Sequence, residues 1–271
     1  MEWLNLLLDP LFRVPLAAGL LLAAALPPLG ALLRLRGEWL AALGLAHVSA
    51  AGTLAGLALH LPGLLGGGIA AILAATLKSA AGARGNDAYG MMILLGWGAT
   101  LLVAANTALG EAMAHALADG QLYFAGPRHL VAAAGFALIL AGALPWLSRR
   151  LIRARFTPED ETANRLPAWR WHFGFDLAVA VGMALGTATI GLMAAFALVF
   201  LPAWAAFRVA PGWRWALTLA ALIGIACYLA AFVTAMALDQ PFGPVMVAML
   251  LVVCPVRSEE RRVGKECIVK C

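Results

Sequence analysis

The sequence predicts an all-α, polytopic membrane protein with eight or nine transmembrane helices. Of its 271 residues, 63% are hydrophobic and only 12% are charged, whereas soluble domains carry about 25% charged residues. Apolar stretches of about 20 residues, the length that spans a bilayer, recur along the whole chain. The charges gather between these stretches, because a charge inside the hydrocarbon is costly. Together these observations indicate one membrane domain, residues 1–256.

The apolar segments succeed one another with short connections. They cover residues 14–35, 39–60, 64–80, 89–109, 130–147, 173–206, 215–238 and 242–255. Residues 173–206 are too many for one crossing at about 1.5 Å per residue. Gly186 and Gly191 interrupt this run and Pro202 lies near its end, so we expect one full helix followed by a short or broken one. Two crossings here give nine passes, and a re-entrant second part gives eight.

The two ends of the chain differ from this pattern. Residues 1–12 combine apolar side chains such as Trp3, Leu6 and Leu7 with the polar Glu2, Asn5 and Asp9, which is typical of an amphipathic helix lying at the membrane interface. The composition changes abruptly at residues 257–271, which are polar and highly charged. We interpret this tail as a non-native extension and exclude it from the functional argument.

Lysine and arginine in the connections predict the orientation of the helices. Every second connection is basic, as is typical of cytoplasmic loops. These connections hold Arg34 and Arg36, Lys78 and Arg84, residues 149–170, and Arg208 and Arg214. The pattern predicts an external N-terminus and a cytoplasmic C-terminus. The tail after Val256 contributes +2 to the net charge of +5, and the same bias explains the remainder without a nucleic-acid partner.

The loop at residues 149–170 is the most polar part of the membrane domain, with nine charged residues. Thr157 is a suitable helix cap and Pro158 a suitable first helical residue. Glu159, Asp160 and Glu161 follow in what would be the first turn, where acidic side chains stabilise a helix. The sequence therefore predicts a short polar helix that projects from the membrane on the cytoplasmic side.

Four stretches, in the same order along the chain, resemble the permease subunits of zinc, manganese and iron-chelate ABC importers. They are the arginine-ended helix and following segment at 29–36 and 43–56, Gly-Gln-Leu-Tyr-Phe to Leu at 120–130, Phe-Thr-Pro-Glu to Leu at 156–166, and Asp-Gln-Pro-Phe-Gly-Pro at 239–244. The resemblance implies a type II ABC importer permease bundle in the bacterial inner membrane. It also implies a homodimer, a separate ATPase, an extracytoplasmic metal-binding protein, and zinc or manganese as substrate.

The resemblance gives the polar loop a function. It implies that Thr157, Pro158, Glu159, Asp160, Glu161 and Arg165 form the coupling helix that receives the ATPase. The chain has no Gly-x-x-x-x-Gly-Lys-Ser/Thr motif of its own. We therefore expect a transport subunit that is not an enzyme, holds no permanent cofactor, and relies on ATP bound to its partner.

His47 is the first candidate metal ligand, because it matches the histidine of the family's second segment. Ionisable groups at membrane depth usually face a pathway. The family's aspartate four residues earlier is replaced by Leu43, which leaves the identity of the ion open. Alternatively, His47 is a structural residue that bonds to backbone or to a hydroxyl such as Ser49 or Thr53.

Two further pairs have the i, i+4 spacing that places ligands on one helix face. Glu111 and His115 lie at a predicted external end, where they receive metal from a binding protein or form a solvated face. His172 and Asp176 lie at a predicted cytoplasmic end, where they pass metal inward or form an interfacial charge pair. Two functional alternatives also remain: an ABC permease for a metal chelate or other small solute, and an ion-driven secondary transporter.

Overall fold

The computed structural model describes residues 10–83, 85–107, 122 and 125–254. Within these residues the chain forms helices joined by short turns, and no strand is present. The prediction of an all-α protein is confirmed. The predicted interfacial helix at residues 1–12 lies almost wholly outside the described residues, as does the tail at 257–271.

Eight of the helices are long and apolar enough to cross a membrane. In chain order the helices are α2 (Pro10–Arg36), α3 (Leu40–Ala58), α4 (Gly63–Ala80), α5 (Asp87–Asn106), α7 (Pro127–Phe156), α8 (Pro158–Ala163), α9 (Trp169–Ile190), α10 (Leu192–Val209), α11 (Trp213–Leu238) and α12 (Phe242–Val253). The 12 residues of α12 span about 18 Å, which is less than the hydrocarbon thickness. The described chain therefore has eight full spans and one apolar helix of partial length.

The long apolar run at 173–206 breaks at one glycine. Gly191 separates α9 from α10 and has a φ of 93°, a left-handed conformation that side chains other than glycine rarely adopt. The expected break is confirmed. The second helix is not short, however: α10 continues through Pro202 for 18 residues and is long enough to span a membrane.

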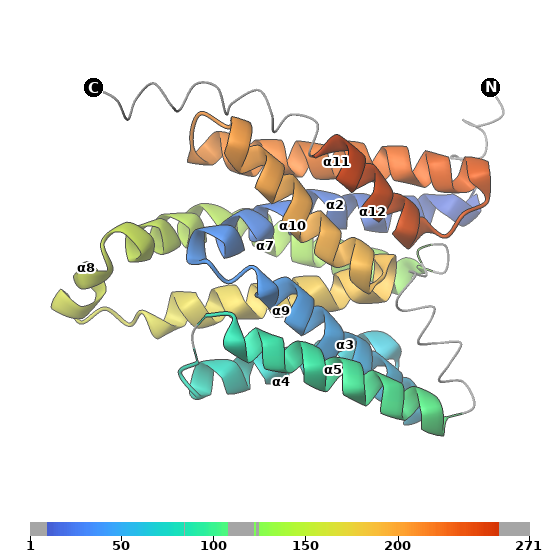
Figure 1. Cartoon of the computed structure of the whole chain (residues 1–271), viewed down its shortest axis with the longest axis horizontal. Helices are drawn as coiled ribbons and strands as arrows, with labels where there is room; N and C mark the ends of the chain where they lie inside the picture. Colours follow the sequence, from blue (N-terminus) through green and yellow to red (C-terminus); the bar gives the residue numbers. More distant parts are fainter. Residues whose placement is uncertain (1–9, 84, 108–121, 123–124, 255–271) are drawn as a thin grey trace.

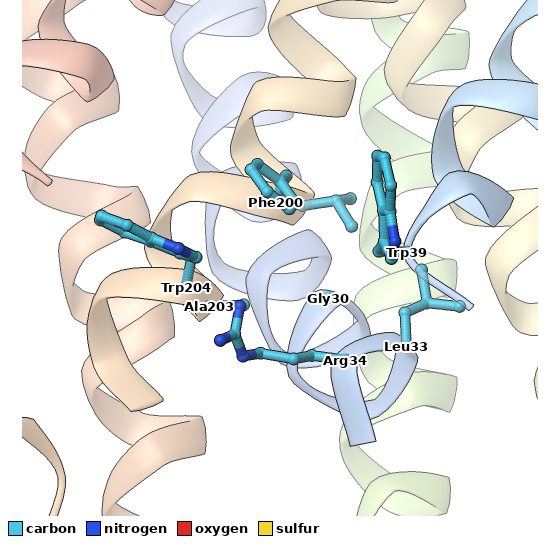
Figure 2. Close-up of a pocket in the computed structure, with 8 residues that line it drawn as sticks. Gly30, Leu33, Arg34, Trp39, Phe200, Ala203 and Trp204 are labelled. Carbon is cyan, nitrogen blue, oxygen red and sulfur yellow. The ribbon is translucent and has the colours of Figure 1, made fainter. Parts of the chain in front are cut away.

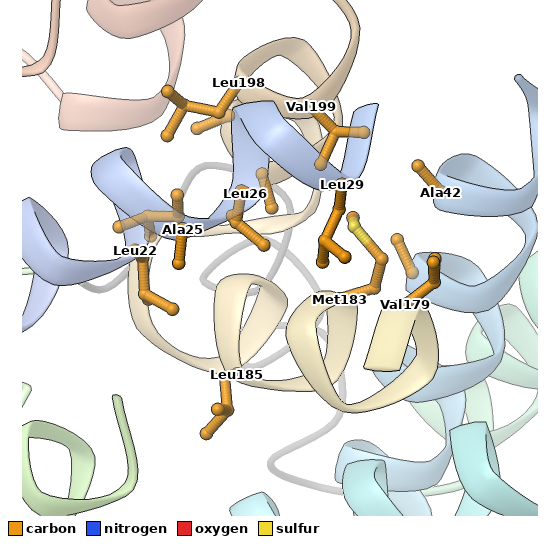
Figure 3. Packing of buried hydrophobic residues seen from close by; sticks show 14 of the residues in the cluster. Leu22, Ala25, Leu26, Leu29, Ala42, Val179, Met183, Leu185, Leu198 and Val199 are labelled. Carbon is orange, nitrogen blue, oxygen red and sulfur yellow. The ribbon is translucent and has the colours of Figure 1, made fainter. Parts of the chain in front are cut away.

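The core forms around α2, which packs against α7, α9, α10 and α11. Leu22, Leu26 and Leu29 of α2 are fully buried and lie among side chains of α9 and α10, including Met183 and Val199. Figure 3 shows these apolar side chains meeting between the helices. Since lipid is as apolar as leucine, close packing and not water exclusion holds such a bundle together.

The connections are sorted between the two ends of the bundle (Figure 1). Those joining α2 to α3, α4 to α5, α7 to α9 and α10 to α11 lie at one end, and those joining α3 to α4, α9 to α10 and α11 to α12 lie at the other. The first group contains the connections predicted to be basic, so we call it the basic end. The short helix α8 projects beyond the bundle at this end.

Candidate functional site

The projecting helix α8 begins at Pro158, as the sequence predicts. Thr157 ends α7: its backbone N–H and its hydroxyl both donate to the Arg153 carbonyl, at 2.7 and 3.0 Å. Both hydrogen bonds that Thr157 donates therefore join it to α7, although the sequence predicted this residue as the cap of the following helix. Glu159 is exposed, and Arg165 is exposed with a left-handed φ of 48°. The side chain of Asp160 lies outside the described part of the structure.

Glu161 joins α8 to the start of α9. Its carboxylate accepts a hydrogen bond of 2.9 Å from the Trp171 indole and lies 3.5 Å from His172 Nε2. Trp171 is buried, and the Arg150 guanidinium of α7 lies 5.2 Å from the centre of its ring. Glu161 and Trp171 therefore attach the projecting helix to both helices that flank it.

A group of four buried charges lies further along α9, one turn beyond His172. Asp176 accepts from Arg36 Nη1 at 2.7 Å and from Lys78 Nζ at 3.0 Å. Glu38 lies 2.7 Å from Arg36 Nη2 and 3.5 Å from Lys78 Nζ. We call Arg36, Glu38, Lys78 and Asp176 the buried charge cluster. His172 and Asp176, which the sequence paired, thus have different partners.

The cluster holds three helices together at the basic end. Its side chains are between 3% and 12% exposed, and two positive charges balance two negative ones. Buried charges are tolerated only when they are paired, because desolvation is expensive. Arg36 ends α2, Lys78 lies in the last turn of α4, and Asp176 belongs to α9. Separating these helices at this end requires exposure or rearrangement of the cluster.

Two aromatic rings complete the surroundings of the cluster. The Lys78 ammonium lies 4.8 Å from the centre of the Tyr89 ring, which is 1% exposed and belongs to α5. The Arg36 guanidinium lies 5.0 Å from the centre of the Phe175 ring. Both arrangements are favourable cation–π contacts. Through Tyr89 the cluster also reaches α5.

His47 lies in α3 and is 8% exposed. Its Nδ1 is 2.9 Å from the carbonyl oxygen of Leu43, and its ring centre is 5.8 Å from that of Trp97 in α5. The sequence predicted either backbone or a hydroxyl as the bonding partner of a structural His47, and the structure shows a backbone carbonyl in this position. Ser49 and Thr53 instead direct their hydroxyls toward Gly67 of α4.

Close helix contact fixes the surroundings of His47. Gly96 of α5 packs against the His47 backbone so tightly that an added Cβ would meet the His47 carbonyl carbon and oxygen. The absence of a side chain at Gly96 lets α5 approach α3 at this level, as expected for small residues between membrane helices. The His47 ring is consequently enclosed between α3 and α5.

The structure does not gather the candidate metal residues into one site. Among the described residues, no group of three or more His, Cys, Asp or Glu side chains could hold a metal ion. Glu111 and His115 lie outside the described residues. His47 belongs to the α3–α5 contact, whereas His172 and Asp176 belong to the basic end.

Sequence reasoning missed three members of the cluster. Arg36 and Lys78 were interpreted as loop cations, and Glu38 was not singled out. The available signal was an acid directly before one apolar segment, Glu38, and a base within the end of another, Lys78. Such residues are expected at the membrane boundary in any case, so their pairing required the three-dimensional arrangement.

Comparison with solved structures shows a shared fold. The chain superimposes on a chain of PsaBC from Streptococcus pneumoniae in complex with Fab, with a TM-score of 0.80 and 14% identity, over 93% of this chain and 92% of that one. It also superimposes on a putative metal-chelate type ABC transporter in an inward-facing conformation, with a TM-score of 0.69 and 15% identity, over 93% and 87%.

Comparison of sequences identifies the family. No curated protein matches the chain. The profile of the ABC 3 transport family matches residues 9–257, which include every helix described above. The chain, an integral membrane protein, therefore belongs to the ABC 3 transport family.

Proposed function

We propose that this chain is the permease subunit of an ATP-driven importer of divalent metal ions, zinc or manganese. In this proposal two copies form the pathway in a bacterial inner membrane, with the N-terminus external and the C-terminus cytoplasmic. A separate ATPase binds the basic end, and an extracytoplasmic metal-binding protein delivers the ion. The attachment of the projecting helix α8 to the bundle through Glu161 carries the proposal.

A subunit driven by a soluble motor needs an element that the motor can push and a rigid connection into the membrane. Helix α8 projects from the bundle, with Glu159 and Arg165 exposed for contact with the ATPase. Glu161 binds Trp171 and His172 on α9, and Asp176 of α9 binds Lys78 of α4 and Arg36 of α2. A displacement of α8 is thus passed to α9 through Glu161, and from α9 to α2 and α4 through Asp176.

His47 is our candidate for contact with the ion inside the membrane. Its ring is enclosed between α3 and α5, and Leu43 contributes a backbone carbonyl where the family has a carboxylate. One histidine is too few ligands for a divalent metal, which prefers four or more. The proposal therefore requires further ligands from the second copy. We assign reception of the ion to Glu111 and His115, and a role in its inward passage to His172 and Asp176.

Transport by reconstituted vesicles tests this function. The permease and its ATPase are placed in vesicles that contain a zinc- or manganese-sensitive dye. ATP is supplied on the side that holds the ATPase, and the binding protein with its metal on the opposite side. We expect ATP-dependent uptake that His47→Ala strongly reduces and that His60→Ala, at an exposed turn, leaves intact. Uptake by the permease alone, without an ATPase, would overturn the proposal. Normal uptake by His47→Ala would remove the role of His47.

A metal chelate is the second candidate substrate. Leu43 at the position of the family's aspartate favours it, since an apolar side chain suits an organic ligand shell better than a bare ion. The same vesicles distinguish the two substrates when free ion and chelated ion are offered in turn. Uptake of the chelate alone would select this second function and would retain the coupling scheme.

A further inference from the structure

A pocket of about 430 Å³ lies at the basic end between α2 and α10, and no residue of the buried charge cluster lines it. Its lining residues come from the last turns of α2, the turn before α3, and the middle of α10. They are Gly30, Leu33, Arg34, Trp39, Val199, Phe200, Ala203 and Trp204. We propose that this pocket binds an anionic membrane phospholipid, with an acyl chain against the apolar wall and the phosphate at the arginines.

The wall of the pocket suits an acyl chain. Leu33, Val199 and Ala203 are buried and apolar, and Phe200 adds a half-buried ring. Gly30 allows α2 to pack directly against α10 at the pocket wall, because a Cβ there would collide with the Val199 carbonyl and force the two helices apart. In a membrane, acyl chains are the molecules that fill such grooves.

The mouth of the pocket suits a phosphate. Figure 2 shows the Arg34 side chain extending from α2 toward Trp204 of α10. Arg208 stacks on Trp204 with its guanidinium 3.5 Å from the ring centre, and it interacts repulsively with Arg34. Arg34 itself lies 5.5 Å from the Phe207 ring centre, and no ion pair joins it to a carboxylate in the described chain. An anion between the two guanidinium groups relieves their repulsion.

The surroundings favour a lipid over a soluble anion. Trp39 is 47% exposed and, with the half-buried Trp204, borders the pocket, and tryptophan is enriched at the headgroup level of membranes. Basic pockets between transmembrane helices commonly bind phospholipid headgroups, and arginine binds phosphate through paired hydrogen bonds. Apolar groove, interfacial tryptophans and paired arginines together match one amphiphilic anion.

Native mass spectrometry of the purified permease tests the proposal. The protein is equilibrated with phosphatidylglycerol or with phosphatidylcholine of the same acyl chains, and the lipids retained per protomer are counted. We expect one tightly retained phosphatidylglycerol. Each of Arg34→Gln and Arg208→Gln should weaken its binding by about tenfold, since a hydrogen bond to a charged group contributes about that factor. Arg34→Lys should keep the preference for the anionic lipid with weaker binding.

A matched control lies outside the pocket at the same end. Arg170 also stacks on a tryptophan, 5.8 Å from the Trp169 ring centre, and Arg170→Gln should retain the lipid fully. Equal retention of both lipids, or equal loss in Arg170→Gln, would overturn the proposal. Displacement of the lipid by millimolar glycerol phosphate would point to a soluble anion instead.

A second copy of the chain is the competing occupant. Trp39→Cys places a thiol at the rim of the pocket, and its oxidation in native membranes reports contact between copies. We expect no disulfide-linked dimer through this position. Efficient cross-linking would mean that protein covers the pocket, and the lipid site would be excluded. Melting curves of all variants in detergent confirm that the lipid counts come from folded protein.

Discussion

The Lys78 ammonium of α4 lies 3.0 Å from the Asp176 carboxylate of α9, and both side chains are at most 6% exposed. These residues are 98 positions apart, and each lies within an apolar segment, near the end that borders a predicted cytoplasmic connection. Arg36 and Glu38 extend this contact to a set of four charges whose sum is zero, and the set joins the helices at the basic end of the bundle. The stability and the movement of this end therefore depend on charge balance.

Removal of one charge from the cluster should be more damaging than removal of a neutral pair. Lys78→Met leaves Asp176 and Glu38 with one cation, and loss of a partner from a buried ion pair typically costs about 3–5 kcal/mol. Lys78→Met/Asp176→Asn restores neutrality and should recover part of the loss. We expect the melting temperature in detergent to fall in the order wild type, double variant, Lys78→Met.

The control for this cycle is Arg153→Met, which removes an exposed cation from α7. An exposed charge of this kind contributes little to stability, so its melting temperature should stay near that of the wild type. Additive losses in the double variant would show that Lys78 and Asp176 are not energetically coupled, contrary to the structure.

Much of the fold followed from hydrophobicity and charge alone. The spans, the break at Gly191 and the helix that begins at Pro158 were all visible as local patterns. The spans depend on the transfer of a short segment from water to lipid. The break and the start of the short helix depend on the conformation of a few residues. The choice between eight and nine passes was assigned to the second part of 173–206, whereas the structure gives a full-length helix there and a helix of partial length, with 12 residues, at 242–253.

The candidate site was predicted less well, because pairing between distant residues leaves no local pattern. Lys78 looked like an ordinary basic loop residue, yet it is 5% exposed and has two acidic partners. Asp176 was singled out but was paired with His172 by spacing. Helix spacing can place two residues on one face, whereas the packing of neighbouring helices decides which residue each one binds.

Glu161 and Glu159 should affect different steps, although they lie on the same short helix. The Glu161 side chain is 20% exposed and binds α9, whereas Glu159 is exposed. We expect Glu161→Ala to retain the ATPase on co-purification while ATP hydrolysis no longer drives uptake. We expect Glu159→Ala to weaken co-purification itself.

Co-purification and the ratio of ions transported to ATP hydrolysed measure these two steps separately. Glu161→Gln keeps an acceptor for the Trp171 indole and should lie between the wild type and Glu161→Ala. A proline scan of residues 159–165 should abolish both assembly and uptake. Normal assembly and uptake throughout the scan would exclude α8 as the contact for the ATPase.

Gly96→Ala should separate α5 from α3 and disturb His47. The added Cβ meets the backbone of His47 and Val48, which cannot move away without shifting the helix. Overpacking of this kind typically costs about 1–3 kcal/mol. Gly98→Ala is the matched control on the same helix, because an added Cβ there has nothing within 4 Å. A lower melting temperature and lower uptake are expected for Gly96→Ala only, and equal behaviour of both variants would contradict the packing.

Leu43→Asp should create the carboxylate–histidine pair that this chain lacks. Helical side chains lean toward the N-terminus, so His47 lies over residue 43, and its Nδ1 already contacts the Leu43 carbonyl at 2.9 Å. A carboxylate on the same face, four residues before the histidine, adds an oxygen ligand of the kind that zinc and manganese accept. We expect the purified variant to retain more zinc or manganese than the wild type after gel filtration, as measured by elemental mass spectrometry. Leu43→Asn controls for polarity without charge, and Leu43→Asp/His47→Ala should lose the gain. Equal metal retention by Leu43→Asp and Leu43→Asn would show that the His47 position is not directed toward a metal, and would favour the chelate as substrate.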